Sequence, residues 1–441
     1  MPSSTAVVIG GGIAGILASK LLSQRGIYVH LHEASPRLGG FLRGPTFNNV
    51  IFPPGPIFFH EHHIAEINEY LYQNPNCPWT TCETYQPGQL TDNSLLDTKT
   101  DSLNLTSLPI SERTQCILSL LYSAITNNTD KQYTNSAFEY LSSRGVTKPV
   151  LVRIRSLLCQ KYRLDICEIP IEILQGIITA RIKLFRSAHI TTILKLMPPI
   201  DNLVADSCYR SRTTSSIIHP QFGNFNRWLD YLEHDLISSG VEIHKNSKLS
   251  SHYINDSQTE SNLSLLFETE KGNYLHKPEF TFTSIPIFSN SQSRPKLASN
   301  QSNRAFSIYI ETKRPLSLKN TYINIYDAST PFTRLTPTRH EQDRTGCILE
   351  GITEHSSDSS KIRTNAVDFL ILHQFINKKD EILSCNIKTR PHTFVTAGKS
   401  SAKHALPQNV IPIGRVNNSL WFTKDLLSYT YRQINESLQS N

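Results

Sequence analysis

The first forty residues constrain the fold more than any other part of this 441-residue chain. A β-branched apolar run at residues 6–9 predicts a buried strand, and Gly10, Gly12 and Gly15 follow it in a G-x-G-x-x-G pattern. A helical segment comes next, and a second strand at residues 28–32 ends in Glu33. This order of strand, glycine turn, helix, strand and acid predicts the dinucleotide-binding part of a doubly wound, parallel α/β sheet.

The glycine pattern has a physical reason at each position. Gly10 makes the tight turn, Gly12 leaves room for the backbone to approach a pyrophosphate, and Gly15 lets the helix pack closely on the strand. Ile13 and Ala14 lie at the start of that helix, where unpaired N–H groups and the helix dipole favour phosphate. We therefore expect these five residues to bind a dinucleotide.

The residues from Glu33 onward indicate which dinucleotide is bound. Glu33 is placed to accept hydrogen bonds from a ribose diol. It is followed by Arg37, Gly39 and Gly40 in an Arg-x-Gly-Gly arrangement. This resembles the start of FAD proteins of the amine oxidase, protoporphyrinogen oxidase, phytoene desaturase and UDP-galactopyranose mutase superfamily. The resemblance implies FAD as cofactor, with the glycine pair close to the flavin phosphates or ribityl chain. Arg37 would add positive charge there; the alternative is a solvated surface arginine.

Composition narrows the class of partner. The net charge of +7 is spread along the chain without a block of five or six basic residues, so nucleic-acid binding is not indicated. It fits an anionic cofactor and an anionic small-molecule substrate. The sequence contains no run of 18 apolar residues, so we expect no membrane span. The eight cysteines show no zinc-type spacing, although Cys77 and Cys82 are close enough to pair. We expect reduced thiols and a cytoplasmic location.

A histidine-containing stretch begins at Gly55. The sequence from Gly55 to Glu61 resembles the mutase pattern G-P-H-I-F-H-T, with His60 at the second histidine and Ile57 at the first. In the mutases the first of these histidines lies near the flavin, so Ile57 argues against strict mutase chemistry. His60 remains a candidate neighbour of the flavin. His60, His62 and His63 together could also suggest a metal site, but a packed or surface histidine cluster is the default and no metal is expected.

Amphipathic runs at residues 106–200 predict a mainly helical region. The part from residue 136 to 165 resembles the helical cap of the superfamily. Arg153, Arg155, Lys161 and Arg163 occupy polar positions in it, and we expect most of them to be solvated and a minority to face an anionic substrate.

The segment 217–249 resembles the second flavin-domain unit of the superfamily. Its helix carries Trp228 and Leu236, a strand is expected at residues 241–244, and the strand after Lys248 would bring the backbone at Leu249 to the adenine. Residues 280–286 resemble the return strand of the same domain.

A further segment, residues 321–340, resembles the "Y-i-y-x-D-x-x-x-P-f-t-R-v" segment of the mutases. Asp327, Pro331, Thr333 and Arg334 match it. The resemblance implies that Arg334 faces the flavin or an anionic substrate, for which a guanidinium is well suited. The alternative is a structural ion pair between Arg334 and Asp327.

The last motif is a strand that ends in Gly414 and Arg415. It resembles the final flavin-binding element of the superfamily, in which Gly-Arg meets the pyrophosphate or ribityl chain. A helix expected from Asp425 would direct its N-terminus at the flavin.

The resemblance implies an α/β protein with a Rossmann-like FAD-binding domain, an inserted mixed-sheet substrate domain and a helical cap. We expect the FAD-binding domain at 1–72, 205–260 and 395–441, the cap at 73–204 and the substrate domain at 261–394. The first functional hypothesis is an FAD-dependent oxidoreductase that transfers a hydride from a small molecule to flavin N5, with His60 and Arg334 as catalytic candidates. The alternatives are a mutase-like sugar-nucleotide isomerase and a flavin-binding, non-catalytic paralogue. The oligomeric state is not predicted.

Overall fold

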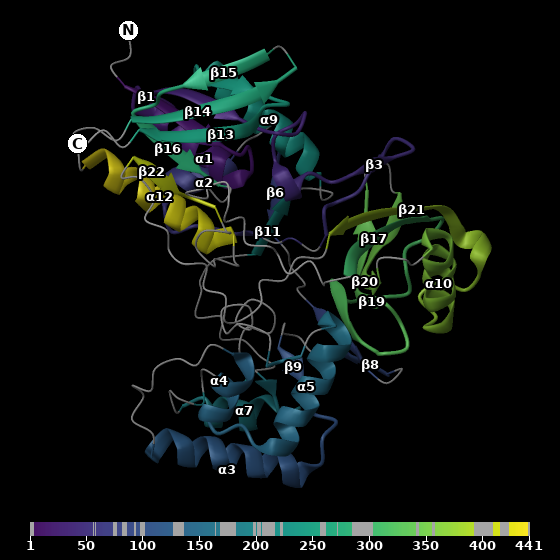
Figure 1. The fold of residues 1–441 in the computed structure, drawn as a ribbon. Coiled ribbons are helices and arrows are strands. Elements are labelled where there is room, and N and C mark those ends of the chain that lie inside the picture. The colour runs from purple at the N-terminus through teal and green to yellow at the C-terminus, as the bar shows by residue number, and fades with distance from the viewer. Residues whose placement is uncertain are drawn as a thin grey trace. The chain divides into compact units, whose positions relative to one another are not determined.

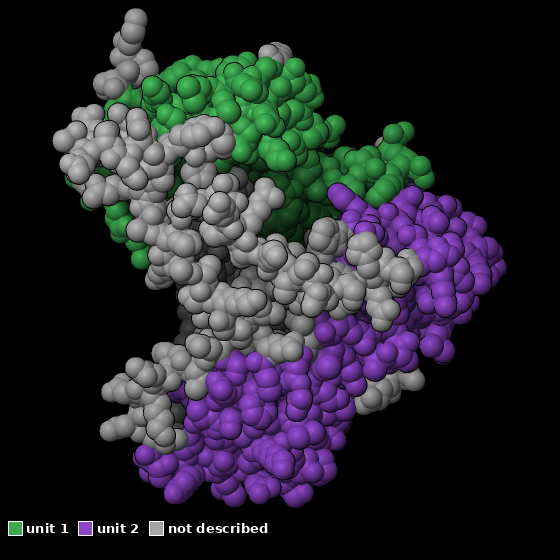
Figure 2. Space-filling model, in the orientation of Figure 1, with its two compact units in different colours: residues 1–82, 215–295, 402–441 green, residues 83–214, 296–401 purple. Residues whose placement is uncertain are grey.

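The computed structural model divides the chain into two compact units, which Figure 2 shows in different colours. Unit 1 comprises Met1–Cys82, Ser215–Pro295 and Ala402–Asn441, and unit 2 comprises Glu83–Thr214 and Lys296–Ser401. The structure describes residues 4–55, 57, 59–73, 77–81, 86–91, 94–97, 102–126, 136–163, 165–167, 182–196, 200, 204, 217–220, 224–255, 262–270, 272–284, 303–340, 344–354, 358–391, 409–414 and 423–439.

A five-stranded sheet with all neighbours parallel forms the centre of unit 1 (Figure 1). In sheet order its strands are β12 (Glu242–His244), β2 (Tyr28–His32), β1 (Thr5–Ile9), β16 (Phe280–Thr283) and β22 (Val410–Pro412). The outer strands come from segments far along the chain, and the predicted return strand pairs with β1 as β16. The prediction of a Rossmann-like parallel sheet is confirmed.

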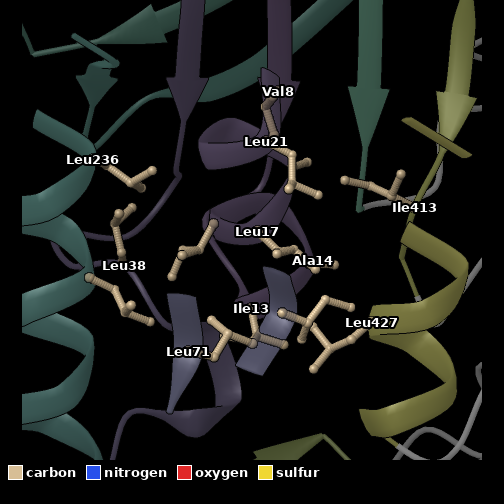
Figure 3. Packing of buried hydrophobic residues seen from close by; sticks show 14 of the residues in the cluster. Val8, Ile13, Ala14, Leu17, Leu21, Leu38, Leu71, Leu236, Ile413 and Leu427 are labelled. Carbon is tan, nitrogen blue, oxygen red and sulfur yellow. The ribbon is translucent and has the colours of Figure 1, made fainter. Parts of the chain in front are cut away.

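Helices cover one face of this sheet. They are α1 (Ile13–Gln24), α2 (Ala65–Leu71), α9 (Phe225–Ser238) and α12 (Thr423–Gln439). Figure 3 shows α1 between the other two long helices, with Leu236 of α9 on one side and Leu427 of α12 on the other. All three helices bury apolar side chains here because their hydrophobic residues recur at helical spacing. We call this packed set of side chains the helix-face cluster.

A three-stranded antiparallel sheet lies against the opposite face (Figure 1). Its strands are β13 (Lys248–Asn255), β14 (Asn262–Thr269) and β15 (Gly272–His276). Strand β1 is buried on both faces because alternate residues point in opposite directions. Val8 enters the helix-face cluster, whereas Val7 and Ile9 pack with Leu265 and Phe267 of the small sheet.

Short strands and aromatic rings complete unit 1. An antiparallel sheet contains β5 (Phe59–His60), β11 (Ile217–Pro220) and β6 (Trp79–Thr81), and a hairpin joins β3 (Thr46–Phe47) to β4 (Val50–Ile51). Phe59, Trp79, Phe225 and Trp228 form edge-to-face or tilted ring contacts with one another. The fully buried Trp228 also donates a hydrogen bond of 2.7 Å from Nε1 to the Leu71 carbonyl.

Unit 2 contains a seven-stranded mixed sheet. In sheet order its strands are β21 (Ile382–Pro391), β17 (Asn303–Thr312), β20 (Thr345–Glu354), β19 (Phe332–Arg339), β18 (Tyr322–Tyr326), β7 (Pro87–Thr91) and β8 (Ser94–Asp97). Helix α10 (Ser359–Leu372) packs on it through Ile362 and Phe369. Only the β18–β7 pair is parallel. The predicted mixed sheet is therefore present.

A second apolar cluster of unit 2 is mainly helical. Its helices are α3 (Ile110–Thr126), α4 (Ala137–Ser143), α5 (Lys148–Tyr162) and α7 (Ala188–Leu194), and β9 (Leu103–Asn104) pairs with β10 (Ile182–Lys183). The sequence ranges expected for the domains divide the chain differently from these units, since β14, β15 and β16 lie in unit 1 rather than with the strands of the mixed sheet.

Candidate functional site

The glycine loop between β1 and α1 is built so that only glycine fits at two positions. Gly10 has φ +98°, in the region that favours glycine. A Cβ at Gly15 would lie 2.0 Å from the Gly10 carbonyl oxygen, which is backbone and cannot move aside. The first turn of α1 therefore packs directly against the end of β1.

Gly12 stands in a different environment. It is the N-cap of α1, it has extended backbone with φ −71°, and a Cβ added to it meets no described heavy atom within 4 Å. No side chain caps the helix, and its first turn, which contains Ile13 and Ala14, carries no acid. The positive end of the α1 dipole and its first N–H groups thus border open space, as an anion-binding helix terminus requires.

The second glycine pair lies beside this terminus. The Gly39 N–H donates to the Gly11 carbonyl at 2.7 Å, and a Cβ at Gly40 would come within 3.5 Å of the Gly12 Cα. Gly39 and Gly40 have φ +113° and +53°. The structure therefore brings together the two glycine motifs that the sequence separates by more than twenty residues.

Glu33 is fixed at the end of β2 by backbone donors. Its Oε2 accepts from the Gly11 N–H at 2.7 Å, and its Oε1 accepts from the Ser35 N–H at 2.8 Å. A carboxylate has further lone pairs, so Glu33 is oriented beside the glycine loop and can still accept from a ribose hydroxyl. Arg37 lies on the exposed turn that follows.

The C-terminal motif reaches the same end of the sheet. A Cβ at Gly414 would lie 2.1 Å from the Ser284 carbonyl oxygen, and the Ser284 N–H donates to the Ile9 carbonyl at 2.9 Å. Gly414 is thereby placed near the end of β1. Ser284, to which the sequence analysis assigned no role, contacts both the end of β1 and Gly414. Arg415 lies outside the described residues, and α12 begins at Thr423, two residues before the expected start.

Leu249 lies on β13, at the bulge where its pairing with β14 shifts register. It packs against the cluster formed by Val7, Ile9 and the small sheet. Its predicted adenine contact stays a prediction.

The histidines after Gly55 separate in the structure. His60 lies in β5, opposite Ile217 of β11. His62 is buried, and its Nε2 lies 3.1 Å from the Lys424 carbonyl and 2.8 Å from Ser428 Oγ of α12. Burial lowers the pKa of His62. This ring anchors the first turn of α12, and the exposed His63 stacks on it.

Arg334 pairs with a residue that sequence reasoning missed. Its Nε lies 2.5 Å from Oε2 of Glu350, which stands opposite it in the β19–β20 ladder. The alternative of an Arg334–Asp327 pair is wrong, because Asp327 Oδ1 instead accepts from the backbone N–H and hydroxyl of Ser329. The partner is fixed by strand register, which a sequence motif does not contain.

Most cations of this helix are expected to be solvated, but the side chain of Lys161 is buried. It is 6% exposed, its Nζ donates to Asn324 Oδ1 at 2.5 Å, and it lies 5.0 Å from the centre of the Tyr326 ring. Asn324 stands opposite Arg334 in the β18–β19 pair. Two cations of unit 2 therefore approach the same part of its sheet.

The turn between β18 and β19 also borders an open hollow of about 670 Å³ against α10. Asp327 and Asp368 contribute to its lining. Two carboxylates therefore border this hollow.

Within the part of the chain that the structure describes, no helix is both long and apolar enough to cross a membrane. The described cysteines are free thiols. Cys82, the partner considered for Cys77, is not among them.

The N-terminal segment matches a known family of nucleotide-binding domains. Residues 8–72 match the family model of the NAD(P)-binding Rossmann-like domain. A carotenoid phi-ring synthase from Streptomyces griseus is 60% identical over 40 residues, which cover 9% of this chain and 8% of the synthase. That match concerns a short segment only.

Solved structures match nearly the whole chain at low identity. A reduced UDP-galactopyranose mutase is similar with a TM-score of 0.72 and 14% identity, over 100% of this chain and 96% of the mutase. A protein from Exiguobacterium sp. 255-15, described as a protoporphyrinogen oxidase, gives 0.65 and 15% over 100% of both chains. A putrescine oxidase variant with redesigned cofactor binding gives 0.63 and 11% over 99% of both. The resemblance is confirmed at the level of the fold: the chain has a Rossmann-like domain, and it shares its fold with the mutase, the protein from Exiguobacterium and the putrescine oxidase variant.

Proposed function

We propose that the chain is an FAD-dependent oxidoreductase that binds FAD in unit 1. The observation that carries the proposal is the open, uncapped N-terminus of α1 at Gly12, bordered by a second glycine pair and by an oriented Glu33. A dinucleotide needs these three features together, because its pyrophosphate must approach backbone N–H groups while its ribose meets an acceptor.

The residues present suit the cofactor, because the start of α1 carries no side-chain cap and Glu33 can still accept a hydrogen bond. Gly10, Gly12, Gly15 and the start of α1 would hold the pyrophosphate, with Gly39 and Gly40 alongside. Glu33 would hold the ribose, the backbone at Leu249 the adenine, and Gly414, Arg415 and Arg37 the remaining phosphate and ribityl contacts. When bound, FAD would supply an acceptor, flavin N5, for a hydride from a small-molecule substrate. The chain's own task would be binding and orientation.

The substrate would be anionic. Lys161 of α5 donates to Asn324, which stands opposite Arg334 in the sheet of unit 2. The guanidinium of Arg334 is oriented by Glu350, and its fork of N–H groups suits a carboxylate or phosphate. We propose His60 and Arg334 as the catalytic candidates. We also propose a cytoplasmic location, which the free thiols of the described cysteines support.

A mutase-like sugar-nucleotide isomerase is the second candidate. The likeness to the reduced mutase and the match from Gly55 to His60 favour it, whereas Ile57 at the first histidine position opposes it. Both candidates require FAD, but only the oxidoreductase changes the redox state of its substrate. Net oxidation of an added substrate would select the first candidate, and a rearranged product without net redox change would select the second.

The visible absorbance spectrum of the purified full chain tests the shared requirement. We expect a flavin spectrum and FAD in the supernatant after acid release. A protein that stays colourless after incubation with FAD would contradict the proposal, and a bound flavin with no turnover of any substrate would favour the non-catalytic paralogue.

A pair of variants makes the test specific to the site. Gly12→Ala adds a Cβ in open space, so the apoprotein should fold while its FAD affinity falls at least tenfold. Gly240→Asn is the matched control, because Gly240 has φ +83°, its Cβ also meets open space, and asparagine tolerates this backbone. It lies after α9, away from the loop, and should retain FAD.

A further inference from the structure

A cluster of histidines fills the space between the parallel sheet and the small sheet of unit 1. Along β2, Val29 and Leu31 enter the helix-face cluster, so His30 and His32 point to the opposite face. Strand β12 pairs with β2 in parallel and places Glu242 beside His30 and His244 beside His32. The small sheet supplies His276 at the end of β15.

The donor atoms of these residues converge. His30 Nδ1 lies 3.2 Å from His244 Nε2, and the two nitrogens lie 3.3 Å and 3.4 Å from the carboxylate oxygens of Glu242. Ligand atoms of a tetrahedral zinc site, with bonds of about 2.0–2.1 Å, stand about 3.3 Å apart. One nitrogen each of His30, His244 and His276 lie within 4.8 Å of one another. His276 therefore offers the third imidazole of the set.

The surroundings hold these rings in place. His32 stacks on Phe267 at 3.7 Å and on His244 at 4.4 Å between ring centres, and its Nε2 contacts His276 Nε2 at 3.1 Å. Tyr28 donates from its hydroxyl to Glu242 at 2.7 Å.

We propose that His30, His244 and His276, with Glu242 as the fourth ligand, form a binding site for a divalent transition-metal ion of the zinc class. Three imidazoles and one carboxylate suit zinc and disfavour magnesium or calcium, which prefer oxygen ligands. Four protein ligands leave no open position, so the role is structural. The ion would fasten β15 to β2 and β12, and thus one sheet to the other.

The test uses the full chain with any affinity tag removed, stripped of metal by a chelator and then titrated with zinc chloride. We expect one zinc ion per chain by elemental analysis after dialysis, and a rise in the unfolding temperature on zinc addition, because a ligand that binds only the folded state stabilises it. Magnesium chloride should neither stay bound after dialysis nor raise the unfolding temperature.

Variants assign the site. His276→Gln and His244→Gln should weaken zinc binding at least tenfold and abolish the temperature rise. His234→Gln is the matched control, since His234 is an exposed histidine of α9 in the same unit. If the histidine variants do not fold, Glu242→Gln, at a side chain that is 46% exposed, should fold and still weaken binding. Wild-type protein that binds no zinc, or His276→Gln that binds it as tightly as the control, would overturn the proposal.

Discussion

The two faces of the parallel sheet in unit 1 are built from the same strands but by different means. On one face, alternate residues of β1 and β2 join a large apolar cluster with three long helices. On the other, the residues between them meet a much smaller cluster, and beyond it lie four histidines and a glutamate. The helix face is stabilised mainly by buried area, whereas the other face depends on ring stacking and polar contacts.

This difference indicates where the fold tolerates change. An apolar face loses stability when buried side-chain volume is removed, by an amount that grows with the cavity left behind. A face of stacked and hydrogen-bonded rings depends on a few partners, each of which contributes less but fixes a particular geometry. The variants that follow test this contrast.

The largest expected effect is on the helix face. Trp228→Ala should lower the free energy of unfolding by about 3–5 kcal/mol, because it removes a fully buried ring and leaves a cavity. Denaturant unfolding of the variant measures the loss. Ile237→Ala on the same helix is the control, since Ile237 is 55% exposed and should change stability by less than about 0.5 kcal/mol. Equal losses for the two variants would contradict the proposed weight of this face.

Gly15→Ala tests the contact between the helix layer and the end of β1. Its Cβ would collide with backbone at Gly10, so we expect a loss of about 1–3 kcal/mol even without cofactor. Gly12→Ala in the same loop should cost the apoprotein less than about 1 kcal/mol. Thermal unfolding of the two cofactor-free variants makes the comparison, and the reverse order would show that the loop packs differently.

On the opposite face, Phe267→Leu should cost about 1 kcal/mol. The substitution keeps most of the apolar volume but removes the stack on His32. A double-mutant cycle with His32→Leu measures the coupling of the two rings. Additive losses would mean that the stack contributes nothing beyond burial.

The smallest effect concerns pH and His62, the buried histidine that contacts α12. Burial lowers the pKa of His62 in the folded protein, so the unfolded chain takes up a proton more readily. Its contribution to stability is complete above the unfolded pKa of about 6.5 and is lost as the pH falls below it. Urea unfolding at several pH values should show a flatter profile for His62→Gln than for the wild type. Identical profiles for wild type and His62→Gln would remove this residue from the acid response.

The β1–α1–β2 unit could be predicted almost to the residue, because its signals are local. Apolar periodicity, the glycines and the acid all lie within one short stretch, and β2 has the bounds that its residues predict. The proximity of Gly39 to the first glycine loop could be inferred from the family resemblance, and the hydrogen bond to Gly11 shows how it is made.

The other contacts of the candidate sites depend on which strands pair, and those strands are far apart in the sequence. Glu350 is the partner of Arg334 only because β19 and β20 are in one register. The histidine cluster was missed for the same reason: alternate histidines in β2 were visible, but nothing in the sequence places β12 and β15 beside them. A polar pair at alternate positions of a strand whose other residues are apolar would have been the available signal.

The course of the chain through unit 1 has a consequence for biosynthesis. Strand β22 and helix α12 close the sheet and the helix layer that β1 and α1 begin. At a synthesis rate of about 5–20 residues per second, the N-terminal elements wait roughly 20–80 s for these partners. During that interval the apolar side of α1 lacks the cover that α12 gives it in the folded protein, so it is exposed to aggregation until α12 has been synthesised.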